Sequence, residues 1–144
     1  MRISAKCRYG IAALIALTYH GSNLTSIFKI SEQLEISKIY LEQVFGKLKH
    51  AGIITSVKGS AGGYKLAKNA KDISLAEIVF ALEDGFSETS YETVRSAPEI
   101  DNVISEVFTE LDAALRKKLS EISLESLSQK AIAGQSEQTF MFYI

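Results

Sequence analysis

The sequence predicts a mainly α-helical fold that contains one small β-hairpin. Two helix patterns are joined by a tight turn that ends in a capping serine, and two short strand patterns around a glycine-rich turn follow directly. Nearer the C-terminus, an apolar stripe at helical spacing continues for about five turns. Together these features are the parts of a winged helix-turn-helix with a long dimerisation helix behind it.

The composition is that of one globular domain. The chain has 144 residues, of which 47% are hydrophobic and 23% charged, so it can bury a core and is not a disordered segment. Its single cysteine, Cys7, excludes an intrachain disulfide. The apolar run 11–17 follows basic residues, as in a signal peptide, but bulky residues 18–20 stand where a cleavage site needs small ones. We therefore expect a first helix in a cytoplasmic protein, with no membrane-spanning segment.

Residues 25–34 and 37–51 predict the two helices of the helix-turn-helix. Ser37 can cap the second helix, and Gly52 is the residue expected at its left-handed C-terminal end. Helical periodicity gives this second helix a buried face made of Leu41, Val44, Phe45 and Leu48. The opposite face presents Ile39, Gln43, Gly46, Lys47 and His50, flanked by Tyr40 and Glu42.

The wing is predicted by residues 53–67. Residues 53–57 are mostly β-branched, residues 58–63 form a flexible turn, and residues 64–67 alternate as a returning strand. The turn is not a nucleotide-binding loop, because Lys65 has neither the preceding glycine nor the following Ser or Thr that such a loop needs.

The second half of the chain predicts further helices. Ser74 and Glu77 form a capping box that opens a helix ended by Gly85, and a polar loop over 86–98 follows. We divide the chain into a winged-helix region (1–71), a connecting helix and loop (72–98), a dimerisation helix (99–120) and a C-terminal helix with an apolar tail (121–144).

The helix over 99–120 carries more apolar surface than a small domain can cover. We expect it to pack on its symmetry mate in a homodimer. The alternative is a long core helix folded back on its own domain. The residues expected at the dimer interface are Ile100, Val103, Ile104, Val107, Leu111 and Leu115.

The chain ends in an apolar segment, 139–144, where polar residues are usual. It is either packed on its own dimer, as an edge strand, or is a peptide ligand whose terminal carboxylate is captured by a partner. The residues expected to bind that partner are Met141, Phe142, Tyr143 and Ile144.

Charge is segregated along the chain. Residues 1–71 hold eleven basic and three acidic residues, a net charge of +8, whereas residues 72–144 carry a net charge of −9. A strongly basic half is typical of a protein that binds a polyanion, although the two halves could also simply attract each other.

On the outward face of the second helix, Gln43 can bond adenine, Glu42 can accept a hydrogen bond from cytosine, and Lys47 can reach phosphate or guanine. At the wing tip, Lys58 can reach the minor groove.

The sequence contains no recognisable set of catalytic or metal-binding residues. His20 and His50 fall at or near helix ends without ligand spacing, and one cysteine cannot form a cluster. Cys7 is interpreted as a small buried residue. The alternative is a redox-sensing thiol activated by Lys6 and Arg8. We expect no catalytic residue, no metal and no cofactor.

The sequence resembles the IscR/NsrR/CymR family of winged-helix regulators over essentially its whole length. The matching blocks are residues 1–10 (MRISAKCRYG), 36–43 (ISKIYLEQ), 51–59 (AGIITSVKG), 62–64 (GGY) and 122–127 (ISLESL). The resemblance implies a homodimer on a palindromic operator, with Tyr40, Glu42 and Gln43 reading bases and Lys58 as the wing cation. The full set expected to contact DNA is Arg2, Lys6, Arg8, Ser37, Lys38, Ile39, Tyr40, Glu42, Gln43, Lys47 and Lys58.

Two departures from the family pattern refine the expected function. Residues 86–98 contain none of the cysteines that hold an iron–sulfur cluster in many members, and Cys7 stands where the family usually has glycine. The ending 140–144 is similar to that of cluster-free members that repress cysteine metabolism, and the resemblance implies cysteine synthase as a co-repressor bound through that ending. The expected function is therefore a repressor of cysteine and sulfur genes. The alternatives are an interaction module that binds no DNA and a redox regulator acting through Cys7.

Overall fold

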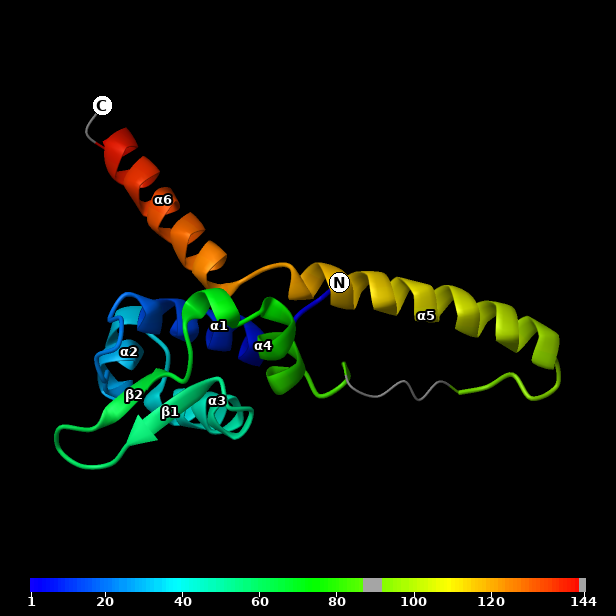
Figure 1. The fold of residues 1–144 in the computed structure, drawn as a ribbon, viewed down its shortest axis with the longest axis horizontal. Helices are drawn as coiled ribbons and strands as arrows, with labels where there is room; N and C mark the ends of the chain where they lie inside the picture. The colour runs from blue at the N-terminus through cyan, green and yellow to red at the C-terminus, as the bar shows by residue number, and fades with distance from the viewer. Residues whose placement is uncertain (87–91, 143–144) are drawn as a thin grey trace.

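The computed structural model of the protein describes residues 1–86 and 92–142. It has the mainly helical fold with one antiparallel hairpin that the sequence predicts (Figure 1). In chain order the elements are α1 (Ala5–Thr18), α2 (Ile27–Leu34), α3 (Lys38–His50), β1 (Ile54–Val57), β2 (Gly63–Leu66), the 3₁₀ helix η1 (Ala70–Asp72), α4 (Leu75–Leu82), α5 (Pro98–Ser120) and α6 (Leu124–Phe142). Helices α1–α4 and the hairpin form a packed body, from which α5 and α6 project in different directions (Figure 1).

Helix α1 begins six residues before the apolar run that predicts it. Ser4 caps it, because its side-chain oxygen accepts a hydrogen bond of 3.1 Å from the backbone N–H of Cys7. Gly10 is buried where α1 crosses α3 and α4, and a side chain there would collide with Leu82. The absence of a side chain at this position lets the three helices approach closely.

Helix α2 begins at Ile27, two residues later than the sequence predicts. Ser26 caps the helix by accepting from the N–H of Lys29 at 3.2 Å. Thr25 is drawn out of the helix because its backbone pairs with Tyr64 of β2, through hydrogen bonds of 2.9 Å and 2.8 Å. Glu35 ends α2 in the left-handed conformation, with φ of 53°. Ser37 caps α3 as predicted.

Strands β1 and β2 form the wing in the order that the sequence predicts. Ile54 lies opposite Leu66, and Val57 lies opposite Gly63. Gly63 has φ of 154°, and a β-carbon there would stand 2.7 Å from the Thr25 carbonyl oxygen. Only glycine at position 63 therefore allows the backbone of Thr25 to lie this close to the hairpin.

Helix α4 has the predicted capping box. The hydroxyl oxygen of Ser74 accepts from the N–H of Glu77 at 3.2 Å, and the Glu77 carboxylate accepts from the N–H of Ser74 at 2.8 Å. The helix ends at Leu82, not at Gly85. Glu83 leaves the helix in an extended conformation, and its carboxylate accepts a 2.7 Å hydrogen bond from the N–H of Ser4.

The core of the body lies between α1, α2, α3, α4 and the hairpin, and the start of α6 also contributes to it. Its largest fully buried side chains are Phe45, Leu14, Leu17, Ile30, Leu41, Leu48, Ile53, Ile54, Ile73, Ile78, Leu82 and Leu124. No helix within residues 1–86 and 92–142 is both long and apolar enough to cross a membrane.

Helices α5 and α6 attach to the body at their adjoining ends. Pro98 occupies the first turn of α5, and at its other end Leu119 is buried. The hydroxyl groups of Ser128 and Thr18 join α6 to α1 at 2.6 Å.

Helix α6 continues to Phe142, so the edge strand considered for the tail is wrong for residues 139–142. The preceding turns contain no proline, and the helix propagates to this point. The predicted partner residues Tyr143 and Ile144 lie outside the described residues.

Candidate nucleic-acid interface

Helix α3 presents the two faces that its periodicity predicts. Leu41, Val44, Phe45 and Leu48 are at most 1% exposed. On the other side Ile39 is 72% exposed, and Glu42, Gln43 and His50 are exposed as well. The predicted base-reading side chains Glu42 and Gln43 therefore share an accessible surface on a helix whose apolar face is buried in the body.

The second half of that outward face borders a groove. The groove has a volume of about 670 Å³ and lies between α3 and α4. It is lined by Glu42, Gln43, Gly46, Lys47, His50, Ala51, Phe80 and Ala81. Because Gly46 has no side chain, the groove opens toward the helix backbone. The sequence could not indicate this groove, since Phe80 comes from α4.

The amino-terminal end of α1 lies beside the first turn of α3. The ring of Tyr9 meets the ring of Tyr40 edge-on, with ring centres 5.6 Å apart and an angle of 82° between the planes. Arg2 and Arg8 are exposed at this end of α1. The contact between Tyr9 and Tyr40 therefore places Arg2 and Arg8 on the same side of the body as the outward face of α3. Tyr40, predicted as a base reader, is half-buried against α1.

The hairpin supplies a further exposed cation. Lys58 follows β1 in the turn between the strands and is exposed, and the neighbouring Val57 is 51% exposed. Hairpin residue Tyr64 packs its ring on Phe45 of α3, with ring centres 4.8 Å apart. The wing is thus fixed to the helix whose outward face it flanks.

Three of the predicted DNA-binding side chains have acidic partners. Lys47 contacts Asp84 at 2.7 Å, Lys6 contacts the same carboxylate at 3.0 Å, and Lys38 lies 3.7 Å from Glu42 on its own helix. Hydrogen bonds from Lys47 and then Lys6 lower the pKa of Asp84 to about 2. The same carboxylate raises the pKa of Lys6. Asp84 is a residue that sequence reasoning missed, because it is 37 and 78 residues away from its partners.

Cys7 is a core residue. Its side chain is 0% exposed, and burial, reinforced by Glu83, raises the pKa of its thiol to about 11. A redox-sensing thiol needs exposure and a lowered pKa. The interpretation as a small buried residue fits this environment, and activation by Lys6 and Arg8 does not.

The capped helix α3, the wing attached to it and the cations around them define a winged-helix transcriptional regulator of the helix-turn-helix type. Comparison with known proteins assigns the family. The chain belongs to the Rrf2 family, whose model, described as an iron-dependent transcriptional regulator, matches residues 3–130.

Individual relatives agree with this assignment. The chain is 30% identical over 145 residues to the transcriptional regulator CymR of Bacillus subtilis, covering 100% of both chains. It is 33% identical over 129 residues to the regulator IscR of Photorhabdus laumondii, covering 88% of this chain and 79% of IscR. The solved structure of CymR, called the global cysteine regulator of B. subtilis, matches with a TM-score of 0.73 at 29% identity, covering 90% of this chain and 98% of that one.

The residues of this chain do not fit the iron group that the family description implies. A cysteine-ligated cluster needs several accessible thiolates, and the 144 residues contain only Cys7, which is buried and holds its proton up to about pH 11. Within the described ranges, no three His, Cys, Asp or Glu side chains gather in a way that could hold a metal ion.

Proposed function

We propose that the chain is a cluster-free transcriptional repressor that binds a palindromic operator as a homodimer and controls cysteine and sulfur genes. The observation that carries the proposal is the exposed polar face of α3 beside the wing cation Lys58, on a region of net charge +8. The metabolic role is supported by the likeness to CymR over both entire chains, since CymR is called a global cysteine regulator.

The homodimer is supported by helix α5. Ile100, Val103, Ile104, Val107 and Leu111 are 46–60% exposed along one side of the helix, and Phe108, which the sequence analysis omitted, is 54% exposed beside them. An apolar stripe of this length on an arm outside the body fits a second copy of the same helix. Leu115 differs from this set, because it packs against the core of its own chain.

The DNA-binding roles are tested by two substitutions with different expected signatures. With the two α3 helices in major grooves about 34–36 Å apart, Gln43→Ala should cost about 1–3 kcal/mol at one base pair and relax specificity there. Lys58→Ala should weaken binding to all sequences similarly and flatten the salt dependence by about one unit of slope for each bound subunit. The measurement is a titration of operator and random duplexes at several salt concentrations.

The outcomes of that titration separate the candidate functions. If Gln43→Ala weakens operator and random DNA equally, α3 does not read bases through this residue. If the unmodified protein binds no duplex even in dilute buffer, the winged helix is an interaction scaffold and the repressor proposal fails.

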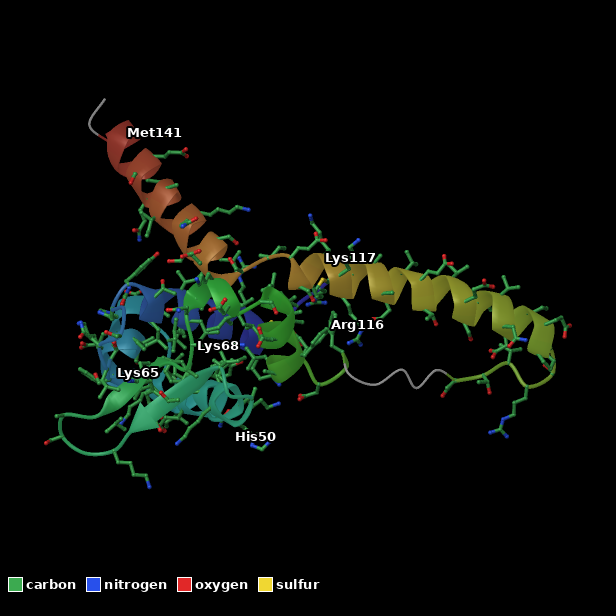
Figure 2. The ribbon with its side chains drawn as sticks, viewed as in Figure 1. His50, Lys65, Lys68, Arg116, Lys117 and Met141 are labelled. Atoms are coloured by element: carbon green, nitrogen blue, oxygen red, sulfur yellow. The ribbon has the colours of Figure 1, made fainter. Side chains whose placement is uncertain are left out.

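Cysteine synthase is the proposed co-repressor, and the segment Met141–Ile144 is the proposed contact. Helix α6 carries this end of the chain away from the body, and the Met141 side chain at its outer end is 76% exposed (Figure 2). A terminal carboxylate with apolar neighbours suits capture by backbone donors in an enzyme pocket. O-acetylserine, as a ligand of the same pocket, would then release the enzyme and weaken repression.

Removal of Tyr143 and Ile144 tests this contact. The truncated protein should bind duplex DNA normally but lose both co-purification with cysteine synthase and the enhancement of DNA binding by the synthase. Ile132→Ala, which trims an exposed side chain earlier on α6, is the matched control and should retain both. Unchanged co-purification after truncation would refute the proposed tail contact.

A further inference from the structure

Asp84 joins three parts of the body that are distant in sequence. It lies in the turn after α4, and its two carboxylate oxygens contact Lys47 of α3 at 2.7 Å and Lys6 of α1 at 3.0 Å. Both lysines belong to the set expected to contact DNA. The carboxylate therefore occupies, in the free protein, two cations that the DNA backbone would need.

The contact is not explained by the stability of the fold. The Asp84 side chain is 77% exposed, and ion pairs in such positions contribute little to folding because water already solvates both charges. Glu83, the next acidic group, faces Lys6 as well, but its carboxylate already accepts from the backbone N–H of Ser4 at 2.7 Å. Asp84 is thus the acidic group that is shared between α1 and α3.

The turn that carries Asp84 is held on both sides. Glu83 is bound to the start of α1 through Ser4, and the carbonyl of Phe86 accepts a hydrogen bond from the Arg116 guanidinium of α5. Arg116 in turn stacks over the Phe80 ring at 4.7 Å and lies at the body end of α5 (Figure 2). These anchors hold the backbone on either side of Asp84 when the lysines turn toward a phosphate.

We propose that Asp84 is an internal competitor of DNA phosphate for Lys47 and Lys6, and that it sets the affinity and salt dependence of DNA binding. This inference rests on the proposed function, with α3 at the DNA. When DNA phosphates take both lysines, the DNA releases two counterions, but the abandoned carboxylate recovers one. The Asp84 charge therefore removes about one counterion from the net release on binding.

Asp84→Asn tests the proposal, with a random-sequence duplex as the probe because the competition involves phosphates and not bases. The variant should bind the duplex about two- to fivefold more tightly at low salt, the range expected for freeing an exposed ion pair. Its affinity should fall more steeply with salt, by about one unit of slope for each subunit that contacts the duplex. Asp84→Glu, which keeps the charge, should retain the slope of the unmodified protein.

Two further variants separate the contact from a general change in charge. Glu106→Gln alters the net charge equally at an exposed position on α5 and should leave affinity and slope nearly unchanged. In a Lys6→Gln, Lys47→Gln background, Asp84→Asn should lose most of its effect.

The inference is overturned if Asp84→Asn behaves like Glu106→Gln, or if its gain persists in full without the two lysines. Failure of the unmodified protein to bind the duplex would instead refute the proposed function, so the two failures are distinguishable.

Discussion

Helices α3 and α5 carry similar apolar stripes but bury them differently. The four apolar side chains on the inner side of α3 are at most 1% exposed, whereas Val103, Val107 and Leu111 of α5 are 60%, 49% and 58% exposed. The amino acids are of the same kind, and the difference lies in what faces them. The body completes its own core within one chain, and most of α5 projects beyond it (Figure 1).

One end of helix α5 is buried against the body, and the apolar stripe further along the helix is exposed. Near its C-terminal end Leu119 is 6% exposed, and Leu115 packs against the core, so this part belongs to the body. Asp112 and Arg116 pair at 2.6 Å next to this boundary. Helical periodicity therefore identifies a face that must be covered, and the length of chain available decides whether the same molecule covers it.

The largest effect is expected from Val107→Asp. Each substitution appears twice in a symmetric dimer, and an uncompensated buried charge costs about 3–5 kcal/mol, so association should weaken by about 6–10 kcal/mol. Sedimentation velocity should show monomers that retain the helical content of the unmodified protein, because Val107 is 49% exposed and lies outside the core cluster of the body.

Thr109→Asp is the matched control for that change. It places the same charge in an exposed position about 200° further round α5, away from the stripe, and should leave the dimer intact. Dimers that survive Val107→Asp would mean that the exposed stripe is not the interface.

The next largest effect is expected from Phe45→Ala, which acts on the body alone. Phe45 is 0% exposed and packs on Tyr64 of the wing, so truncation should lower the free energy of unfolding by about 3–5 kcal/mol. Phe28, which is 59% exposed, should tolerate the same truncation with a loss below about 0.5 kcal/mol. Denaturant titrations in the Val107→Asp background would measure both without the contribution of association. A Phe45→Ala loss as small as that of Phe28→Ala would contradict a self-sufficient core.

A smaller effect is expected from Cys7 at high pH. The fold raises the pKa of this thiol from about 9 to about 11, so the neutral thiol contributes stability below pH 9 that disappears as the pH rises through 11. Unfolding free energies of the unmodified protein relative to Cys7→Ala should fall by about 2–3 kcal/mol across this window. Rapid alkylation of the native thiol at neutral pH would contradict the buried position.

The local parts of the fold could be predicted from the sequence because short-range physics determines them. Ser37 and Ser74 mark helix starts through hydrogen bonds to residues three positions away. The inner face of α3 follows from the helical period alone. The family assignment confirms the class of regulator that these parts indicate.

The long-range parts could not be predicted in this way. Thr25 leaves α2 because it pairs with Tyr64, 39 positions further on, and no local pattern contains that partner. Asp84 follows a helix whose end was expected at Gly85, and its two lysines are brought to it only by the crossing of α1, α3 and α4. Leu115 fits the stripe of α5 in sequence, yet the position where the helix meets the body assigns it to the core.

Two adjacent glycines, Gly62 and Gly63, lie at the base of the wing, where a side chain does not fit. A β-carbon at Gly62 would overlap the Val57 carbonyl group, and one at Gly63 would meet Thr25. Residues 58–61 beyond them are exposed. Exchange of residues 58, 60 and 61 should therefore change the strength of binding to all duplexes alike while the hairpin keeps its position, whereas Gly59, with φ of 110°, should stay glycine.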